Sequence, residues 1–372
     1  MTEFENTAPG QEPENNEHRP LENIVPPVPD TLGVPEAPEV PVVAVPESET
    51  LNFSTRLDLN ALRSSIEAVK HEIGSVIVGQ HKMVDQLLVA ILSGGHVLLE
   101  GVPGVAKTIT AKLLSKALSL DFSRIQFTPD LMPSDILGTS VFDLSKSEFN
   151  FKKGPIFSNF VLIDEVNRAP AKTQAALFEV MEERQITVEG ETYILDAPFL
   201  VIATQNPIEQ EGTYRLPEAQ LDRFLFKINI SYPKIDEEIA ILQRENALKD
   251  HDKLGNIRKV LTQQDIISFQ HIVKQIVIEP QLIEYIAKIV VNTRENAFLY
   301  LGASPRASIA ILNAAKGYAA LRSRDFVTPD DIKDAAIPVL QHRVVVAPER
   351  EMEGLTSEQI IKQIVDTVEI PR

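Results

Sequence analysis

Eight consecutive residues, running Gly-Val-Pro-Gly-Val-Ala-Lys-Thr from Gly101 to Thr108, have the types and spacing that bind phosphate. Glycines let backbone N–H groups turn inward around phosphate oxygens, and a helix that begins directly after the loop adds partial positive charge. Lys107 would reach the β- and γ-phosphates of ATP, and Thr108 would ligate Mg²⁺. A plain turn before a helix is the alternative. The residues expected to surround the nucleotide are Gly101, Val102, Pro103, Gly104, Val105, Ala106, Lys107, Thr108 and Ile109.

One position departs from the usual spacing G-x-x-x-x-G-K-[ST], because Ala106 stands where a glycine is expected. Alanine adopts helical dihedral angles without strain, so we expect the loop to turn into the helix at this residue. Its methyl group must then fit beside the phosphates.

A pair of acidic residues, Asp164 and Glu165, follows the apolar segment that starts at residue 159. Adjacent residues of a strand face opposite ways, so Asp164 is expected to point at the metal and Glu165 at a water. Glu165 is then the candidate base that polarises the attacking water. A solvated acidic pair at a strand end is the alternative, which the phosphate loop upstream disfavours.

A second apolar segment, residues 198–204, ends in the amides Gln205 and Asn206. An amide beside the γ-phosphate can orient water without adding charge, although Asn-Pro also favours a turn. Further along, Arg223 could stabilise charge on a transferred phosphate or form a surface ion pair. Arg306 is expected in the first turn of a helix, where a cation is disfavoured, and this placement hints at an anionic partner.

The elements that must position these residues alternate between strand and helix. Short buried strands are expected at 96–101, 159–166, 198–204 and 225–230, with helices at 107–119 and from residue 170. Buried apolar strands between helices are typical of an α/β domain with a mainly parallel sheet. After Pro233 we expect helices and no further strands, at 236–248, 263–276, 280–295, 304–323, 328–340 and 356–368.

Charge and composition separate the first 50 residues from the rest. The 372-residue chain carries a net charge of −17, with 25 prolines and no cysteine. Residues 1–50 contain eleven of the acidic residues, ten of the prolines and a single base, Arg19. This composition predicts a disordered tail. Without cysteine there is no thiolate metal site, and the seven scattered histidines make a transition-metal site improbable.

Targeting signals are not expected from this sequence. The first residues carry two glutamates and no basic residue, which is the opposite of a secretory signal. No apolar run approaches the ~20 residues of a membrane span. We therefore expect a cytoplasmic protein with no membrane span.

Four segments together resemble the MoxR family of AAA+ ATPases: GVPGVAKT, LIDEVNRAPAKTQAALFEVMEERQ, VIATQNPIEQEGTYRLPEAQLDRF and GASPRA. The resemblance runs from about residue 76 to about residue 343, and alanine before the loop lysine is usual in that family. It implies a parallel-sheet αβα core of the P-loop AAA+ type with a C-terminal all-helical lid. The implied division is a tail at 1–52, a core at 53–233, a lid at 234–345 and an extension at 346–372. Hairpins are implied at 136–156 and 185–198.

The resemblance also implies roles for single residues. Val78, Gly79 and Gln80 match the stretch beside the adenine. Lys107 and Thr108 match the Walker A motif, and Asp164 and Glu165 match Walker B. Asn206 matches sensor 1 and Arg306 matches sensor 2. Arg223 matches the arginine finger that acts on a neighbouring subunit, with Arg168 and Arg215 as alternatives.

The activity implied is ATP hydrolysis by a ring, with a hexamer as the expected assembly. The ring would remodel client proteins or mature enzyme complexes, with metal insertion as one form of maturation. Proteins with a von Willebrand factor A domain are implied as partners. Two other classes stay open. A nucleic-acid motor of a related clade would need a basic pore, and the acidic composition makes nucleic acid an unlikely partner. A nucleotide-gated scaffold would bind ATP and scarcely turn it over.

Overall fold

The computed structural model describes residues 57–207, 214, 216–247 and 257–371. All of them belong to one compact unit, Ser54–Arg372. The tail expected at 1–52 lies outside the described residues.

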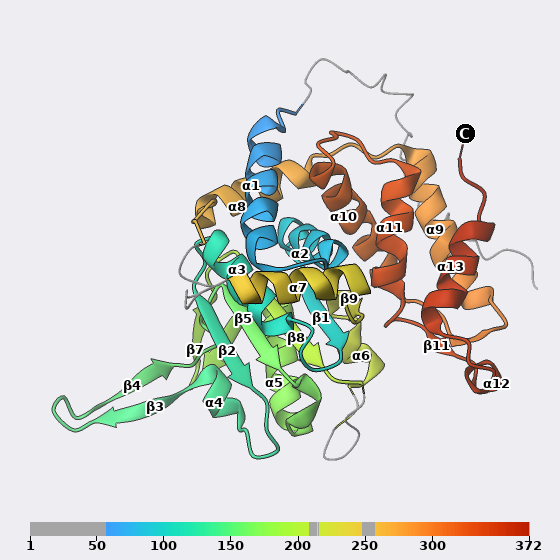
Figure 1. Cartoon of the computed structure of the whole chain (residues 1–372). Coiled ribbons are helices and arrows are strands. Elements are labelled where there is room, and N and C mark those ends of the chain that lie inside the picture. The colour runs from blue at the N-terminus through green and yellow to red at the C-terminus, as the bar shows by residue number, and fades with distance from the viewer. Residues whose placement is uncertain (1–56, 208–213, 215, 248–256, 372) are drawn as a thin grey trace, which may run out of the picture. The chain divides into compact units, whose positions relative to one another are not determined.

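A five-stranded parallel sheet forms the centre of this unit, with the strand order β2-β5-β8-β1-β9 (Figure 1). The strands are β1 (His96–Gly101), β2 (Phe122–Gln126), β5 (Phe160–Asp164), β8 (Leu200–Gln205) and β9 (Phe224–Ile230). Four of these strands were predicted. The fifth, β2, was not, because its sequence Phe-Ser-Arg-Ile-Gln contains no apolar run and only Ile125 in it is buried.

Alternate residues of the sheet enter two separate hydrophobic cores. On β5, Phe160 and Leu162 face one core, while Val161 and Ile163 face the other. Helices α1 (Asn60–Val76), α2 (His81–Ser93) and α3 (Lys107–Ala117) cover the first face. Helix α5 (Ala171–Glu183) covers the second face. The sheet is therefore the middle layer of an α/β/α arrangement.

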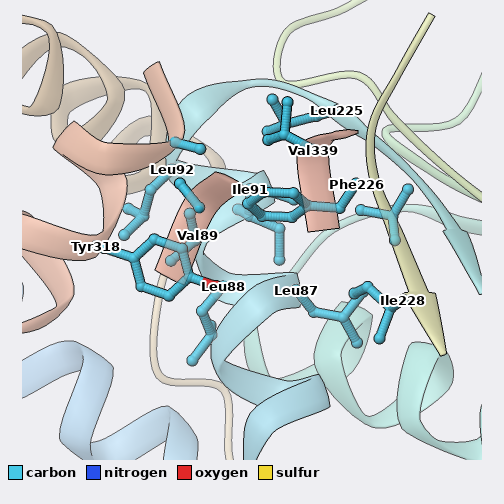
Figure 2. Close-up of a cluster of buried hydrophobic side chains, with 14 of the residues drawn as sticks. Leu87, Leu88, Val89, Ile91, Leu92, Leu225, Phe226, Ile228, Tyr318 and Val339 are labelled. Atoms are coloured by element: carbon cyan, nitrogen blue, oxygen red, sulfur yellow. The ribbon is translucent and has the colours of Figure 1, made fainter. Parts of the chain in front are cut away.

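Helix α2 had no counterpart among the predicted elements. Every residue from Gln86 to Leu92 is buried, so the helix shows no polar stripe that would give it helical periodicity. Figure 2 shows its Leu87, Leu88 and Ile91 among side chains from β9, with Tyr318 of helix α10 close by. This helix joins the sheet to the C-terminal helices through one continuous core.

Two antiparallel hairpins extend the core, as the sequence predicted. One joins β3 (Gly138–Asp143) to β4 (Glu148–Lys153), and Figure 1 shows it extending away from the sheet. It follows the short helix α4 (Pro133–Leu137). The other joins β6 (Gln185–Val188) to β7 (Glu191–Ile194). Phe151 of the first hairpin stacks on Tyr193 of the second with ring centroids 4.6 Å apart.

The C-terminal part is helical, with one correction. Strands β10 (Leu299–Leu301) and β11 (Val345–Val346) pair in an antiparallel ladder, so the expectation of no strands after Pro233 was wrong. Both strands are too short to show a periodic pattern. The helices are α7 (Ile235–Ala247), α8 (Gln263–Lys274), α9 (Pro280–Glu295), α10 (Pro305–Leu321), α11 (Pro329–Leu340), α12 (Pro348–Met352) and α13 (Ser357–Thr367).

The remaining described elements are the short 3-10 helix η1 (Val166–Arg168) after β5 and the short helix α6 (Glu218–Leu221) before β9. Within the described part of the chain, no helix is long and apolar enough to cross a membrane.

Candidate active site

The phosphate loop connects the end of β1 to the start of α3. Gly104 has a positive φ of 87°, and Ala106 has φ 62° and ψ 19°, which is the left-handed region. The expectation that Ala106 would take right-handed helical angles was therefore wrong. A left-handed backbone at a residue with a side chain costs roughly 1–2 kcal/mol. The loop needs this turn to lead the chain into α3, whichever residue stands there.

Gly101 is required for a different reason. A Cβ atom at this residue would lie 2.9 Å from the carbonyl oxygen of Ile230 and 3.1 Å from its Cβ. The loop therefore begins where β1 approaches β9 too closely for any side chain.

Lys107 reaches back over the ends of two strands. Its Nζ donates a hydrogen bond to the Gly101 carbonyl at 2.6 Å, and it lies 3.5 Å from the Gln205 carbonyl. The ammonium group is thus held between the loop and the end of β8. This is the position from which it could meet a phosphate bound in the loop.

A cleft of about 390 Å³ opens beside the loop. Its lining combines the loop, the acidic pair and polar side chains from two strands. The lining residues are Pro103, Gly104, Ala106, Lys107, Thr108, Ile109, Arg124, Gln126, Asp164, Glu165, Thr204 and Asn206. Residues from four segments of the chain therefore converge on one space.

The acidic pair lies in this cleft, but not by strand alternation. Strand β5 ends at Asp164, and Glu165 has a left-handed backbone with φ 58° and ψ 52°. The prediction that the two residues face opposite sides of one strand was wrong, because the chain turns at Glu165. The turn brings both carboxylates to the same cleft.

Asp164 is almost fully buried and each of its oxygens accepts a hydrogen bond. The Thr204 hydroxyl donates to Oδ1 at 3.1 Å, and Arg124 Nε donates to Oδ2 at 2.6 Å. Thr204 Oγ1 also accepts from the Glu165 N–H at 3.1 Å. Strand β8 thereby fixes the backbone and the side chain of the acidic pair together.

Glu165 is held by two donors on its Oε2 atom. Gln126 Nε2 donates at 2.7 Å, and Arg168 Nη1 donates at 3.0 Å. Arg168, one of the alternatives for the arginine finger, therefore contacts the acidic pair of its own chain. Arg215, the other alternative, lies outside the described residues.

Sequence reasoning missed Arg124 and Gln126. Both lie on β2, whose register pairs Gln126 with Asp164. Residues two apart on a strand share a face, so both side chains reach the cleft. The signal that could have found them is the Arg-x-Gln spacing next to Ile125, but it carries meaning only once β2 is known to border β5.

The stretch beside the adenine in the resemblance lies just before α2. Gly79 and Gln80 both have positive φ, 65° and 55°. A Cβ at Gly79 would lie 2.3 Å from Glu237 Oε1 on α7, and Gln80 Nε2 donates to the Ser231 carbonyl at 3.2 Å. Gly79 and Gln80 therefore lie against the segment that follows β9, and none of Val78, Gly79 and Gln80 lines the 390 Å³ cleft.

Arg223 and Arg306 lie together at the other end of the sheet. Arg306 Nη2 donates to Glu182 Oε1 at 2.6 Å, and Arg223 Nε lies 3.5 Å from Glu182 Oε2. Arg223 directly precedes β9, which pairs in parallel with β1 from His96↔Phe224 to Gly101↔Ile230. A strand of this length spans roughly 20 Å, so this pair is distant from the phosphate loop of its own chain.

Two buried histidines, His96 and His342, form hydrogen bonds to backbone groups. The Val201 N–H donates to His96 Nδ1 at 3.0 Å, so the proton is on Nε2, which donates to the Met181 carbonyl at 3.1 Å. Burial lowers the pKa of His96 to about 4. Burial also lowers the pKa of His342 well below its usual range. Neither residue lines the 390 Å³ cleft.

The donor set of the cleft suits Mg²⁺. A buried carboxylate and a hydroxyl beside a triphosphate are the oxygen ligands that Mg²⁺ prefers. Asp164 and Thr108 supply these groups. Among the described residues, the cleft included, no group of three or more His, Cys, Asp or Glu side chains is placed to hold a metal ion, so the bound phosphates would have to supply further ligands.

A parallel sheet in the order β2-β5-β8-β1-β9, with a phosphate loop after β1 and acidic residues after β5, defines a P-loop ATPase of the AAA+ class. Comparison with known proteins agrees. The family model for the ATPase family associated with various cellular activities matches residues 96–226, and the AAA lid domain model matches residues 291–364.

Relatives cover most of the chain. The YeaC protein of Bacillus subtilis is 47% identical over 305 residues, which is 82% of this chain and 94% of that protein. Chaperone MoxR1 of Mycobacterium tuberculosis is 43% identical over 317 residues, covering 83% of each chain. A solved structure from Cytophaga hutchinsonii is 44% identical with a TM-score of 0.78, covering 84% of this chain and 97% of that one. The chain belongs to the MoxR family of AAA+ ATPases.

Proposed function

We propose that the chain binds ATP with Mg²⁺ in the 390 Å³ cleft and hydrolyses it. The observation that carries the proposal is the convergence of Lys107, Asp164 and Glu165 on that one cleft. Lys107 and the backbone N–H groups of the loop bind the phosphates, while Thr108 and Asp164 hold the metal. Bound Mg²⁺ would neutralise charge on the phosphate oxygens.

Glu165 is the proposed base that polarises the attacking water. Its Oε2 accepts from Gln126 and Arg168, and the water would take the place of one of these donors. Asn206 is nearly buried and lines the same cleft, so its amide can orient the water without adding charge.

Arg223 is proposed to act on the nucleotide of a neighbouring subunit. Arg223 is distant from its own phosphate loop, so the cleft it can serve is that of a neighbouring subunit. Arg306 lies beside Arg223, because both contact the Glu182 carboxylate. A head-to-tail contact of this kind closes into a ring when its rotation permits. We propose such a ring, with six subunits as the expected number.

The output proposed is remodelling of partner proteins or enzyme complexes, possibly including metal insertion. Support comes from the relative named Chaperone MoxR1, which is 43% identical to this chain. Proteins with a von Willebrand factor A domain are proposed partners on the family resemblance.

The proposal is tested by Lys107→Ala. Because Lys107 is the cation of the loop, we expect the affinity for ATP to fall by about a hundredfold, measured by calorimetry at saturating Mg²⁺. Lys112→Ala is the matched control, since Lys112 is exposed on the same helix and outside the cleft. Unchanged affinity in Lys107→Ala would reject the phosphate-loop assignment.

A further inference from the structure

Arg124 binds the carboxylate that is proposed to hold the metal. Its Nε lies 2.6 Å from Asp164 Oδ2, its side chain is half exposed, and the residue lines the cleft. The guanidinium group thus lies between a buried carboxylate and the cleft that would hold the phosphates.

Asp164 depends on this contact in the structure. Its side chain is 8% exposed, and its two oxygens accept from Thr204 and from Arg124. A buried carboxylate without a positive partner is costly, so Arg124 balances its charge.

Mg²⁺ held by Asp164 would bring a second cation to the same buried carboxylate. Two cations on one buried carboxylate repel each other, so a metal held by Asp164 would favour the departure of Arg124 from Oδ2. The arginine side chain is long and flexible, and Arg124 lines the cleft together with Lys107 and Thr108. Glu165 in the same cleft already accepts from Gln126 and Arg168, so the negative charges left for Arg124 would be those of the nucleotide phosphates.

We propose that Arg124 is a positioning residue that exchanges Asp164 for the nucleotide phosphates when Mg²⁺ binds. The inference rests on the proposed function, because it assumes that this cleft receives Mg²⁺ and ATP. Arg124 then couples the two binding events: it opposes metal binding in the absence of nucleotide, and it adds a cation to the phosphates once the metal has bound.

Replacing Arg124 should therefore shift the two affinities in opposite directions. In Arg124→Gln, Mn²⁺ binding without nucleotide, followed by electron paramagnetic resonance, should tighten by about tenfold because no cation has to be displaced. In the same variant, affinity for a non-hydrolysable ATP analogue at saturating Mg²⁺ should weaken by about tenfold because a phosphate contact is lost. A merely structural partner of Asp164 would weaken both.

Arg168→Gln is the matched control, because Arg168 is the cation on the other carboxylate, Glu165. If Arg168→Gln tightens Mn²⁺ binding as much as Arg124→Gln does, the loss of any positive charge near the cleft explains the effect, and the proposal is overturned. Both affinities weakening in Arg124→Gln, or neither changing, would also overturn it. Arg124→Met keeps the aliphatic stem and replaces Arg124→Gln if that variant does not fold. Failure of both variants to fold would assign Arg124 a structural role and reject the exchange.

Lys107→Ala separates this inference from the proposed function. If Lys107→Ala binds the analogue normally, the assignment of the cleft itself fails. If Lys107→Ala loses binding while Arg124→Gln behaves as the wild type, the cleft assignment stands and only the exchange is rejected.

Discussion

At the residue scale, the residue types of the phosphate loop predict its position in the fold but not the backbone angles of every residue in it. The types at Gly101, Lys107 and Thr108 place the loop correctly between strand and helix. The backbone at Ala106 could not be predicted from its type, because a left-handed angle is imposed by the loop and opposes the preference of alanine. The same holds at Glu165, which turns where the strand pattern would continue.

Ala106→Gly should relieve this strain. We expect the free energy of unfolding to be unchanged or to rise by up to about 1 kcal/mol, because glycine enters the left-handed region without steric cost but loses more entropy on folding. Urea unfolding without nucleotide measures it. The control is Ala175→Gly at an exposed position inside α5, which should lose about 1 kcal/mol. Equal losses in the two variants would contradict the strained backbone.

At the element scale, apolar runs predicted four of the five sheet strands, and the family resemblance implied both hairpins. Three kinds of element were missed: α2 is buried at every residue from Gln86 to Leu92, β2 has a single buried residue, and β10 and β11 are too short to show a period. Missing β2 is also why Arg124 and Gln126 were missed, since their role depends on which strand lies beside β5.

The packing of α2 against α10 gives a prediction at this scale. A Cβ at Gly317 of α10 would lie 2.8 Å from Val89 Cγ1 and 2.8 Å from Ser93 Oγ, both on α2. Gly317→Ala should therefore lower the free energy of unfolding by about 1–3 kcal/mol, although alanine is the better helix former. Thermal or urea unfolding would show it.

Gly74 of α1 is the matched control for this contact. Nothing lies within 4 Å of a Cβ built there. Gly74→Ala should raise the free energy of unfolding by about 0.5–1 kcal/mol. A stabilising Gly317→Ala would mean that the two helices are less closely packed than the structure indicates.

At the scale of the whole molecule, the described chain places its two proposed catalytic parts at opposite ends of the sheet. The phosphate loop follows the end of β1. Arg223 precedes β9, and the start of β9 lies beside the start of β1. The sequence alone could not predict this separation, because it depends on β9 lying parallel beside β1. If Arg223 serves the proposed site, a second copy of the chain has to supply it.

Mixing two inactive variants tests that requirement. Arg223→Ala should lower ATP turnover by about tenfold or more, because the negative charge on the transferred phosphoryl group is no longer stabilised by the guanidinium. Adding Lys107→Ala subunits, which keep Arg223, should restore turnover in the mixed assembly. Adding the double variant Arg223→Ala/Lys107→Ala should not. Absence of any rescue by the single variant would favour a role for Arg223 within its own subunit.

The central claim is that this cleft binds and hydrolyses ATP with Glu165 as the base, and Glu165→Gln tests it most directly. We predict that the variant binds ATP with nearly the wild-type affinity while its Mg²⁺-dependent turnover falls by about a hundredfold or more, because the water loses its base. Glu179→Gln, an exposed change on α5, should keep wild-type turnover. Turnover at the wild-type rate in Glu165→Gln would contradict the account, and so would a wild-type protein that binds ATP without hydrolysing it.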